Sequence, residues 1–479
     1  MDCLSAFPAR QRFYLVVLGL LFCLFQGRGN AQETKPPCTA ARGNETEAAD
    51  EPEIKLALSA YDRGDLLKAE RLLRDLARRD PANFTVTETL GLVYADRGDF
   101  ASAIPLLEQA CTLSSSSALA FANLGAAFLK EGRNQDALRA LTRAASLDPS
   151  NAQTESNLGQ ALAQAGRFRQ AAEAFQLAAR AEPTNPDVLY NWALALFNLG
   201  DFNRAEEVLD RVPSKESSPP VQSLLGDIAE KLGHFEEAGE HFKRAATLDP
   251  SEQNVYTLGA ELARHWNFKP ATEIFLYGTS KYPASARLQV GLGVSKYGNA
   301  DYAGASSIFS LLLARDPDNA LYADLLGRSC SLTALEKNTG CDKLNGFAER
   351  HPQNATAACF AATGILRRPA SSKQLELARR LLRQAIAAEP KLANAYFEMG
   401  VLEQQEMHWG ESVAPLERAV ALDPEYVEAH YRLARAYARI GKQELAQREI
   451  AFQQKYGSQK KEKTDARLRD LPTFLITLQ

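Results

Sequence analysis

The residues best suited to chemistry in this sequence are its histidines and cysteines. His234 and His241 enclose the stretch HFEEAGEH, which places imidazole and carboxylate ligands near one another. The two histidines are about two helical turns apart, and the H-E-x-x-H order of zinc hydrolases is absent from the sequence. Nucleophile-elbow, phosphate-loop and dinucleotide-binding motifs are absent from it as well. We therefore expect no catalytic residues, no metal site and no cofactor.

Two cysteines have a spacing that permits a bond. Cys330 and Cys341 bracket the segment SLTALEKNTG, and a disulfide between them would face across a helix hairpin. Closing a loop of about ten residues would add up to roughly 2–3 kcal/mol of stability. Cys359 competes as a partner, and buried free thiols are the alternative to any bond.

The elements that must position these residues follow from a repeat. Glycines recur at intervals of about 34 residues and often follow a leucine, and a series of alanines recurs at 33 or 34 residues. A third series of prolines, usually after an acidic residue, closes each unit. The glycines are Gly91, Gly125, Gly159, Gly226, Gly259, Gly293, Gly327 and Gly400; the alanines run from Ala103 to Ala305; the prolines include Pro149, Pro183, Pro250, Pro283, Pro317, Pro390 and Pro424.

These series resemble the tetratricopeptide repeat, whose signature is L-G-x2-Y, then A-x3-F, then P at a period of 34. The resemblance implies an all-α fold, a right-handed superhelical α-solenoid of about twelve helix pairs between residues 52 and 456. No unit buries its apolar face alone, so stacking of units supplies the core. The pattern is irregular around 330–373, where we expect a local distortion.

Small residues have a structural role in this interpretation. We expect Gly159 and Ala171 to let the two helices of one unit approach closely, while Leu158, Leu162 and Phe175 fill the gaps between units. Glycines between the paired helices, such as Gly166, suit a turn with positive φ.

Three asparagines share one register position. Asn123, Asn157 and Asn191 each lie two residues before the glycine position of the first helix, which faces the concave groove in this family. The register resembles the asparagine ladder of O-GlcNAc transferases and one asparagine of the carboxylate clamp of co-chaperones. That resemblance implies that the three amides hold an extended peptide, because each offers one acceptor and two donors. The alternative is that exposed asparagine is merely tolerated there.

The two ends of the chain differ from the repeats. Residues 1–31 contain arginines, the apolar run FYLVVLGLLFCLF and a small-residue exit, which is typical of a signal peptide; an uncleaved anchor is the alternative. Residues 32–51 indicate a flexible tether, and 457–479 a C-terminal capping helix, with a partner-docking tail as the alternative. We expect an exported protein, periplasmic or secreted if bacterial, without membrane insertion after cleavage.

The expected function is therefore interaction and not catalysis. The net charge of −4 provides no basic excess for nucleic acid, so a protein or peptide partner is favoured. We expect a scaffold that binds an extended peptide or a helix in its concave groove. The alternative is a structural subunit of an envelope complex that engages through the convex face or the termini.

Overall fold

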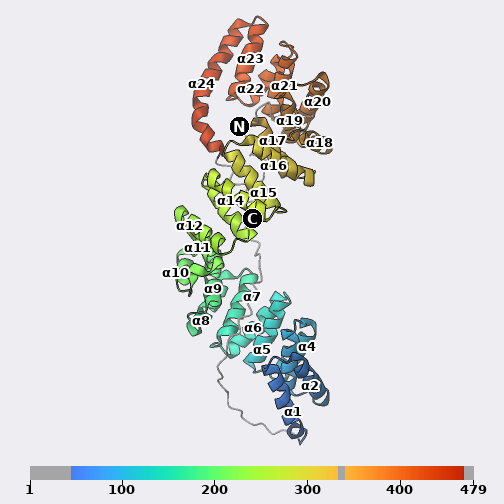
Figure 1. The fold of residues 1–479 in the computed structure, drawn as a ribbon, viewed down its shortest axis with the longest axis vertical. Helices are drawn as coiled ribbons and strands as arrows, with labels where there is room; N and C mark the ends of the chain where they lie inside the picture. The colour runs from blue at the N-terminus through green and yellow to red at the C-terminus, as the bar shows by residue number, and fades with distance from the viewer. Residues whose placement is uncertain (1–44, 333–339, 469–479) are drawn as a thin grey trace. The chain divides into compact units, whose positions relative to one another are not determined.

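The computed structural model describes residues 45–332 and 340–468, and every regular element in these ranges is helical (Figure 1). The described residues contain 24 α-helices and one short 3-10 helix, η1 (Lys215–Ser217). The odd-numbered helices are the first members of pairs: α1 (Glu45–Asp62), α3 (Phe84–Asp96), α5 (Ala118–Lys130), α7 (Ala152–Gln164), α9 (Pro186–Leu199), α11 (Pro219–Leu232), α13 (Glu252–Arg264), α15 (Ala286–Gly298), α17 (Ala320–Leu332), α19 (Ala355–Leu366), α21 (Ala393–Gln405) and α23 (Val427–Arg439). The even-numbered helices follow them: α2 (Leu66–Arg79), α4 (Phe100–Leu113), α6 (Asn134–Leu147), α8 (Phe168–Ala181), α10 (Phe202–Asp210), α12 (Phe235–Leu248), α14 (Phe268–Lys281), α16 (Tyr302–Arg315), α18 (Lys343–Arg350), α20 (Ser372–Ala388), α22 (Val413–Leu422) and α24 (Gln443–Leu468). The expectation of an all-α array of helix pairs is confirmed.

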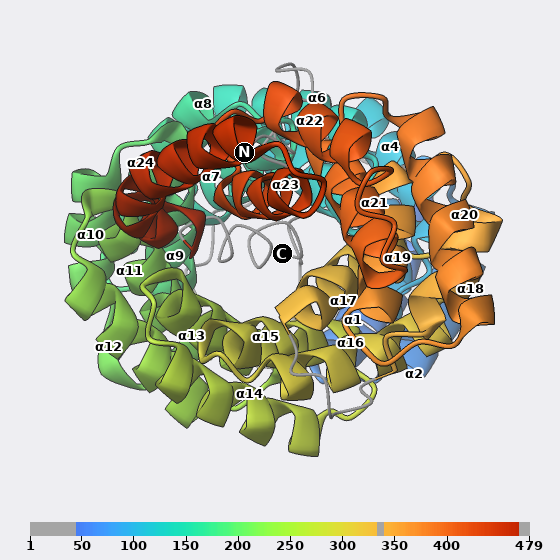
Figure 2. The same cartoon turned by 90° about the horizontal axis from the view of Figure 1, so that it is seen from above.

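The described helices form two compact units, one of α1–α12 and one of α13–α24. Within each unit, most first helices contact the first helix of the next pair, for example α5 with α7 and α19 with α21. Such contacts are nearly absent between successive second helices of the described chain. Figure 2 shows the consequence inside the unit of α13–α24, where α15, α17 and α19 lie on the inner side of the curve and α14, α18 and α20 on the outer side.

Side-chain caps begin about half of the described helices. Asparagine or serine precedes many first helices, as at Asn151, whose side chain accepts a hydrogen bond from the backbone N–H of Thr154. Aspartate has the same role before several second helices, as at Asp99, which accepts from Ser102. These oxygens satisfy backbone donors that have no partner inside the helix. The capping residues therefore help to fix where the helices that carry them begin.

The repeat glycines are explained by the large residue sixteen positions later. A Cβ atom on Gly159 would lie 2.9 Å from the ring of Phe175, and one on Gly226 would lie 2.7 Å from Phe242. The same pairing recurs in other repeats, with leucine or phenylalanine as the large residue. Phe175 thus covers Gly159 within its own pair, a contact that adds to its expected packing between units. Ala171 is fully buried in the same core.

The turn between paired helices contains one residue with positive φ in most pairs, but not between α19 and α20. Glycine takes this position in most repeats, as at Gly98 and Gly166, which have φ of 78° and 72°. Trp266, Ala300 and Met407 take it in three others, with φ of 65°, 60° and 66°. An L-residue is strained in this conformation, whereas glycine is not. The turn thus has the same geometry even where the glycine is missing.

The array departs from regularity where the sequence is irregular. The second helix α18 has only eight residues, compared with fourteen in α16. Gly327, which would meet residue 343 under the regular spacing, instead faces the ring of Phe360 in α19. The segment 367–371 lengthens the following turn before α20 begins.

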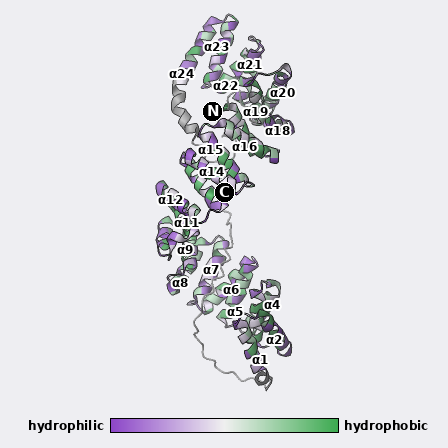
Figure 3. Cartoon of the chain, viewed as in Figure 1, coloured by the Kyte–Doolittle hydropathy of each residue, from purple (hydrophilic) through white to green (hydrophobic). Residues whose placement is uncertain are grey.

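The expected capping helix of residues 457–479 begins within α24, and its residues 469–479 lie outside the described residues. α24 runs from Gln443 to Leu468, so residues 457–468 continue the second helix of the last pair. None of the described helices is both long and apolar enough to cross a membrane. Figure 3 shows that individual helices carry hydrophobic and hydrophilic residues together, as stacked amphipathic helices require. The expected signal peptide and residues 32–44 of the expected tether lie outside the described residues, whereas residues 45–51 of that tether belong to the helix α1.

Candidate functional site

The three predicted groove asparagines lie at the same register position of α5, α7 and α9. These are first helices of consecutive pairs, and each contacts the next. The side chains of Asn123, Asn157 and Asn191 are all half-buried. The structure therefore places the three amides at the same position of three consecutive first helices in the unit of α1–α12.

The first amide is already engaged. Asn123 Nδ2 donates a hydrogen bond of 3.1 Å to Glu88 Oε1 on α3, the preceding first helix. Glu88 is buried, and burial raises the pKa of its carboxyl while the bond from Asn123 opposes that rise. A peptide bound at Asn123 would share this amide with Glu88 or use its carbonyl oxygen.

The other two asparagines are less constrained. Asn157 Oδ1 accepts a hydrogen bond of 3.0 Å from Gln153 Nε2 within α7, which is an exchangeable contact near the surface. Asn191 follows Tyr190 and precedes Trp192, whose ring packs beneath the Arg211 guanidinium at 5.5 Å. Since an amide has two donors and two acceptor lone pairs, Asn157 retains capacity for a ligand.

The two cysteines singled out in the sequence are joined. Cys330 at the end of α17 and Cys341 before α18 form a disulfide with their Cα atoms 5.9 Å apart. Cys359, the competing partner, is a buried free thiol, as is Cys111. The bond spans residues 333–339 and ties the short α18 to the first helix of its pair.

Within the unit of α13–α24, one cluster of described residues has the composition of a metal site. The ligand atoms of Glu403, Glu406 and His408 lie within 4.8 Å of one another. The guanidinium of Arg379 forms ion pairs with both carboxylates. Arg379 therefore already supplies the positive charge that a cation would bring, and the cluster is a salt-bridge network between α20 and the α21–α22 turn. His234 and His241 do not converge on this cluster; His241 Nδ1 instead lies 2.9 Å from Gln222 Oε1.

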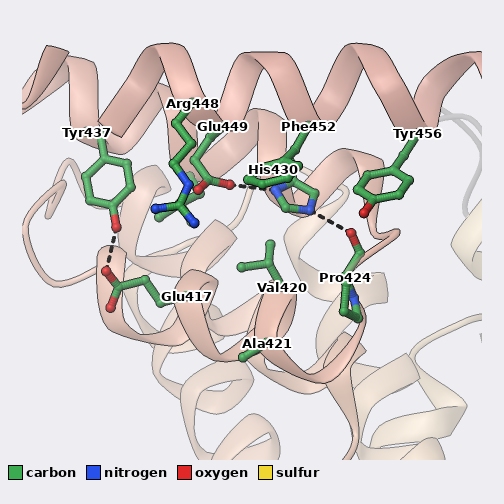
Figure 4. A pocket seen from close by; sticks show the side chains of 11 residues that line it. Glu417, Val420, Ala421, Pro424, His430, Tyr437, Arg448, Glu449, Phe452 and Tyr456 are labelled. Atoms are coloured by element: carbon green, nitrogen blue, oxygen red, sulfur yellow. Dashed lines mark hydrogen bonds and ion pairs between the residues drawn. The ribbon is translucent and has the colours of Figure 1, made fainter. Parts of the chain in front are cut away.

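A cavity of about 270 Å³ opens between α22, α23 and α24 (Figure 4). At its wall, the buried His430 places Nε2 2.9 Å from the carbonyl oxygen of Pro424 and Nδ1 2.5 Å from Glu449 Oε2. A carbonyl oxygen only accepts, so Nε2 is the donor in the bond to Pro424, while Nδ1 faces the Glu449 carboxylate. The rings of Phe452 and Tyr456 from α24 stack beside the imidazole. These contacts attach α24 to the last pair, so the cavity belongs to the packing at the end of the array.

Sequence reasoning missed two features of the inner helices. One is Glu88, whose bond to Asn123 depends on side-chain directions that spacing does not give. The other is a set of arginines on α23, namely Arg432, Arg435 and Arg439, whose spacing of three and four residues already placed them on one helix face. A search for charge with helical periodicity would have found this second set.

Comparison with protein families identifies repeats at both ends of the array. A family model described as the cilia and flagella-associated protein 70 C-terminal domain matches residues 28–260. A model described as a tetratricopeptide repeat matches residues 416–448. No curated protein matches the chain.

Solved structures resemble parts of the chain. The Pseudomonas aeruginosa protein PilF is 21% identical and covers 44% of this chain and 96% of its own, with a TM-score of 0.38. PilW, described as a type IV pilus biogenesis factor, is 20% identical over 43% of this chain and 96% of its own, with a TM-score of 0.39. YrrB, described as a tetratricopeptide repeat protein with an unusual peptide-binding site, is 15% identical over 38% of this chain and 94% of its own, with a TM-score of 0.36.

Proposed function

We propose that this tetratricopeptide-repeat protein is a non-catalytic scaffold. It would hold an extended peptide or a helix of a partner protein against its first helices. The observation that carries this proposal is the row of half-buried amides on α5, α7 and α9. Amide side chains in a row can pair with a peptide backbone whatever its sequence, because they offer donors and acceptors at each repeat. The families that match the chain are generally non-catalytic scaffolds, which agrees with this function.

The matched test uses the three asparagines. Full-length protein and the variant Asn123→Ala, Asn157→Ala, Asn191→Ala would each be crosslinked in their native extract and their partners quantified. A control with Asn134→Ala, Asn198→Ala and Asn254→Ala changes the same residue type on the same scaffold at other register positions. The proposal expects the partner to be lost with the groove variant and retained with the control.

Equal capture by all three proteins would contradict the groove proposal. That outcome would favour a structural subunit of a larger complex, which engages through the outer second helices or the termini. Far-ultraviolet circular dichroism of each variant would ensure that a lost partner does not merely report a lost fold.

We also propose that the protein is exported. Support comes from the signal-like pattern of residues 1–31 and from the Cys330–Cys341 disulfide, since disulfides persist in oxidising compartments. The name of the matching family refers to cilia and flagella, and a ciliary protein in a reducing compartment is the alternative.

Mass spectrometry of protein isolated under thiol-trapping conditions separates these two locations. Export predicts an N-terminus near Gln32 and a Cys330–Cys341 pair that resists alkylation until it is reduced. Retention of Met1 together with alkylation of both cysteines would contradict export.

A further inference from the structure

The inner helices at the end of the array carry a concentration of positive charge. Arg432, Arg435 and Arg439 follow one another at intervals of three and four residues along α23, so they lie on one side of the helix. Arg435 and Arg439 are exposed, and Arg432 is half-buried. Arg367 at the end of α19 adds a fourth guanidinium to the neighbourhood, since it contributes to the electrostatic environment of Arg432.

These charges lack the partners that most arginines of the array have. Among the described residues, no carboxylate oxygen lies within 4.0 Å of a guanidinium nitrogen of Arg432, Arg435 or Arg439. Arg432 Nη1 instead donates 3.3 Å to the neutral amide of Gln404. Burial, followed by repulsion from Arg435 and Arg367, lowers the pKa of Arg432. Within the part of the chain that the structure describes, Arg432, Arg435 and Arg439 therefore have no ion-pair partner.

The buried carboxyl of Glu398 offsets little of the positive charge of the neighbouring arginines. Glu398 on α21 accepts a hydrogen bond of 3.2 Å from Arg367 and is only 4% exposed. Burial raises the pKa of Glu398 despite attraction from Arg367 and Arg432. The acids of the adjacent turn, Glu403 and Glu406, are occupied by Arg379.

Aromatic rings hold the two exposed arginines in place. The Arg435 guanidinium lies 5.7 Å from the ring centroid of Trp409 and 5.8 Å from that of Tyr431. Arg439 lies 5.3 Å from the Trp409 centroid on the same surface. Trp409 comes from the turn between α21 and α22, so the arrangement joins two consecutive repeats. Such cation–π contacts orient a guanidinium without neutralising its charge, which leaves its N–H donors available.

Exposed apolar surface borders the charge. Tyr431 is 51% exposed and Met407, in the strained turn beside Trp409, is 66% exposed. We name Met407, Trp409, Tyr431, Arg435 and Arg439 the basic–aromatic patch. A ligand for this patch needs carboxylates for the guanidinium groups and an apolar side chain for the rings.

We propose that the basic–aromatic patch binds an acidic peptide segment of a partner protein that contains at least two carboxylates and an apolar residue. Planar carboxylates match the paired N–H donors of arginine, and the uncompensated charge favours an anionic partner. This inference rests on the proposed scaffold function, because it names the chemistry of one partner. It uses none of the asparagines on α5, α7 and α9.

The test is a titration of full-length protein with labelled peptides, followed by fluorescence anisotropy. The probe is an acetylated peptide of six glutamates and one central leucine, and its isosteric control replaces each glutamate by glutamine. We expect the acidic peptide to bind and the glutamine peptide to bind at least about tenfold more weakly, the equivalent of one charge-assisted pair or more.

Substitutions of single arginines and of arginine pairs test whether the acidic peptide binds at the basic–aromatic patch. Arg435→Gln with Arg439→Gln should weaken binding of the acidic peptide by about tenfold or more. Arg418→Gln is the matched control, because Arg418 is exposed on α22, lies over the Tyr396 ring at 5.9 Å and has no ion pair among the described residues. It should change binding by less than about twofold. Arg435→Lys with Arg439→Lys keeps the charge and should retain more binding than the glutamine pair.

Several results would overturn the proposal. Equal binding of the acidic and glutamine peptides would exclude recognition of carboxylates. An unchanged affinity of the Arg435→Gln, Arg439→Gln variant would place any binding elsewhere. Tighter binding of a twelve-residue oligothymidylate than of the acidic peptide would assign the patch to a phosphate polyanion. The asparagine triple variant separates the two proposals, since it should bind the acidic peptide like the unaltered protein.

Discussion

The pairing of a small residue with a large one sixteen positions later makes a sharp prediction at Gly226. A Cβ atom added there would lie 2.7 Å, 2.8 Å and 2.9 Å from three ring atoms of Phe242. Nonbonded carbon atoms prefer about 3.5–4.0 Å, so the ring would have to move by about 1 Å. Phe242 is only 3% exposed and therefore has no free space in which to move.

The change in the free energy of unfolding that Gly226→Ala causes is the sum of two opposing contributions. Replacing a helical glycine by alanine gains about 1 kcal/mol from helix propensity. Overpacking a close-packed core costs about 1–3 kcal/mol. Gly226→Ala should therefore lower the free energy of unfolding of its repeat by about 0–2 kcal/mol.

The same pair of helices provides the control. Gly239 lies within α12, and a Cβ atom there would meet nothing within 4 Å. Gly239→Ala should raise stability by the propensity gain alone, about 1 kcal/mol. Because that gain is common to both variants, their difference of about 1–3 kcal/mol isolates the packing cost.

Hydrogen exchange of the full-length variants measures this difference where it arises. Peptides from α11 and α12 should exchange faster in Gly226→Ala than in Gly239→Ala, by about tenfold for each 1.4 kcal/mol. If both variants protected these peptides equally, the proposed packing of Phe242 on Gly226 would be refuted.

Three further predictions address the turn, a buried acid and the disulfide. Met407→Gly should relieve the strain of a left-handed backbone and raise the free energy of unfolding by about 0.5–1 kcal/mol, which a higher midpoint of thermal unfolding would show. Ala300→Gly should raise the midpoint in the same way. An unchanged or lower midpoint for both variants would count against strain at these turns. Burial raises the pKa of Glu155, so its contribution to stability is present below the ordinary glutamate pKa and is lost as the pH rises through the folded-state value. Glu155→Gln should therefore be stabilised relative to the unaltered protein at pH 7 and not at pH 4 in thermal melts, and a constant difference would contradict this sign. Cys341→Ser should cost about 2–3 kcal/mol of local stability and speed hydrogen exchange in α17 and α18, whereas exchange unchanged in both helices would show that the bond contributes nothing.

Much of the fold could be predicted from the sequence because each repeat is specified locally. The glycines, the closing prolines and the 34-residue period all describe contacts within a unit or between neighbours. Gly327 shows where this reasoning ends: its large partner is Phe360 from α19, because α18 is short and out of register. The sequence predicts that residues 330–373 are irregular. The spacing of the repeat alone could not predict that Phe360 would cover Gly327 in place of a residue from α18.

The candidate site was less predictable because it depends on side chains from different repeats. The register of Asn123 is visible in the sequence, but its bond to Glu88 depends on rotamers set by packing between α3 and α5. Similarly, the spacing of Arg435 and Arg439 is visible, while the contribution of Trp409 requires the turn between α21 and α22 to lie beside α23. Contacts that join repeats are the part that periodicity does not specify.

The most direct test of the scaffold function is photo-crosslinking from defined faces of the repeats in living cells. A photoreactive phenylalanine would replace Gln160, which is exposed on α7 one residue after the repeat glycine, or Arg169, which is exposed on the second helix α8. Binding in the groove predicts that Gln160 captures a distinct partner protein, that Arg169 does not, and that Asn123→Ala, Asn157→Ala, Asn191→Ala abolishes the capture. Capture of the same partner from Arg169 alone, or capture from Gln160 that survives the asparagine substitutions, would contradict binding in the groove.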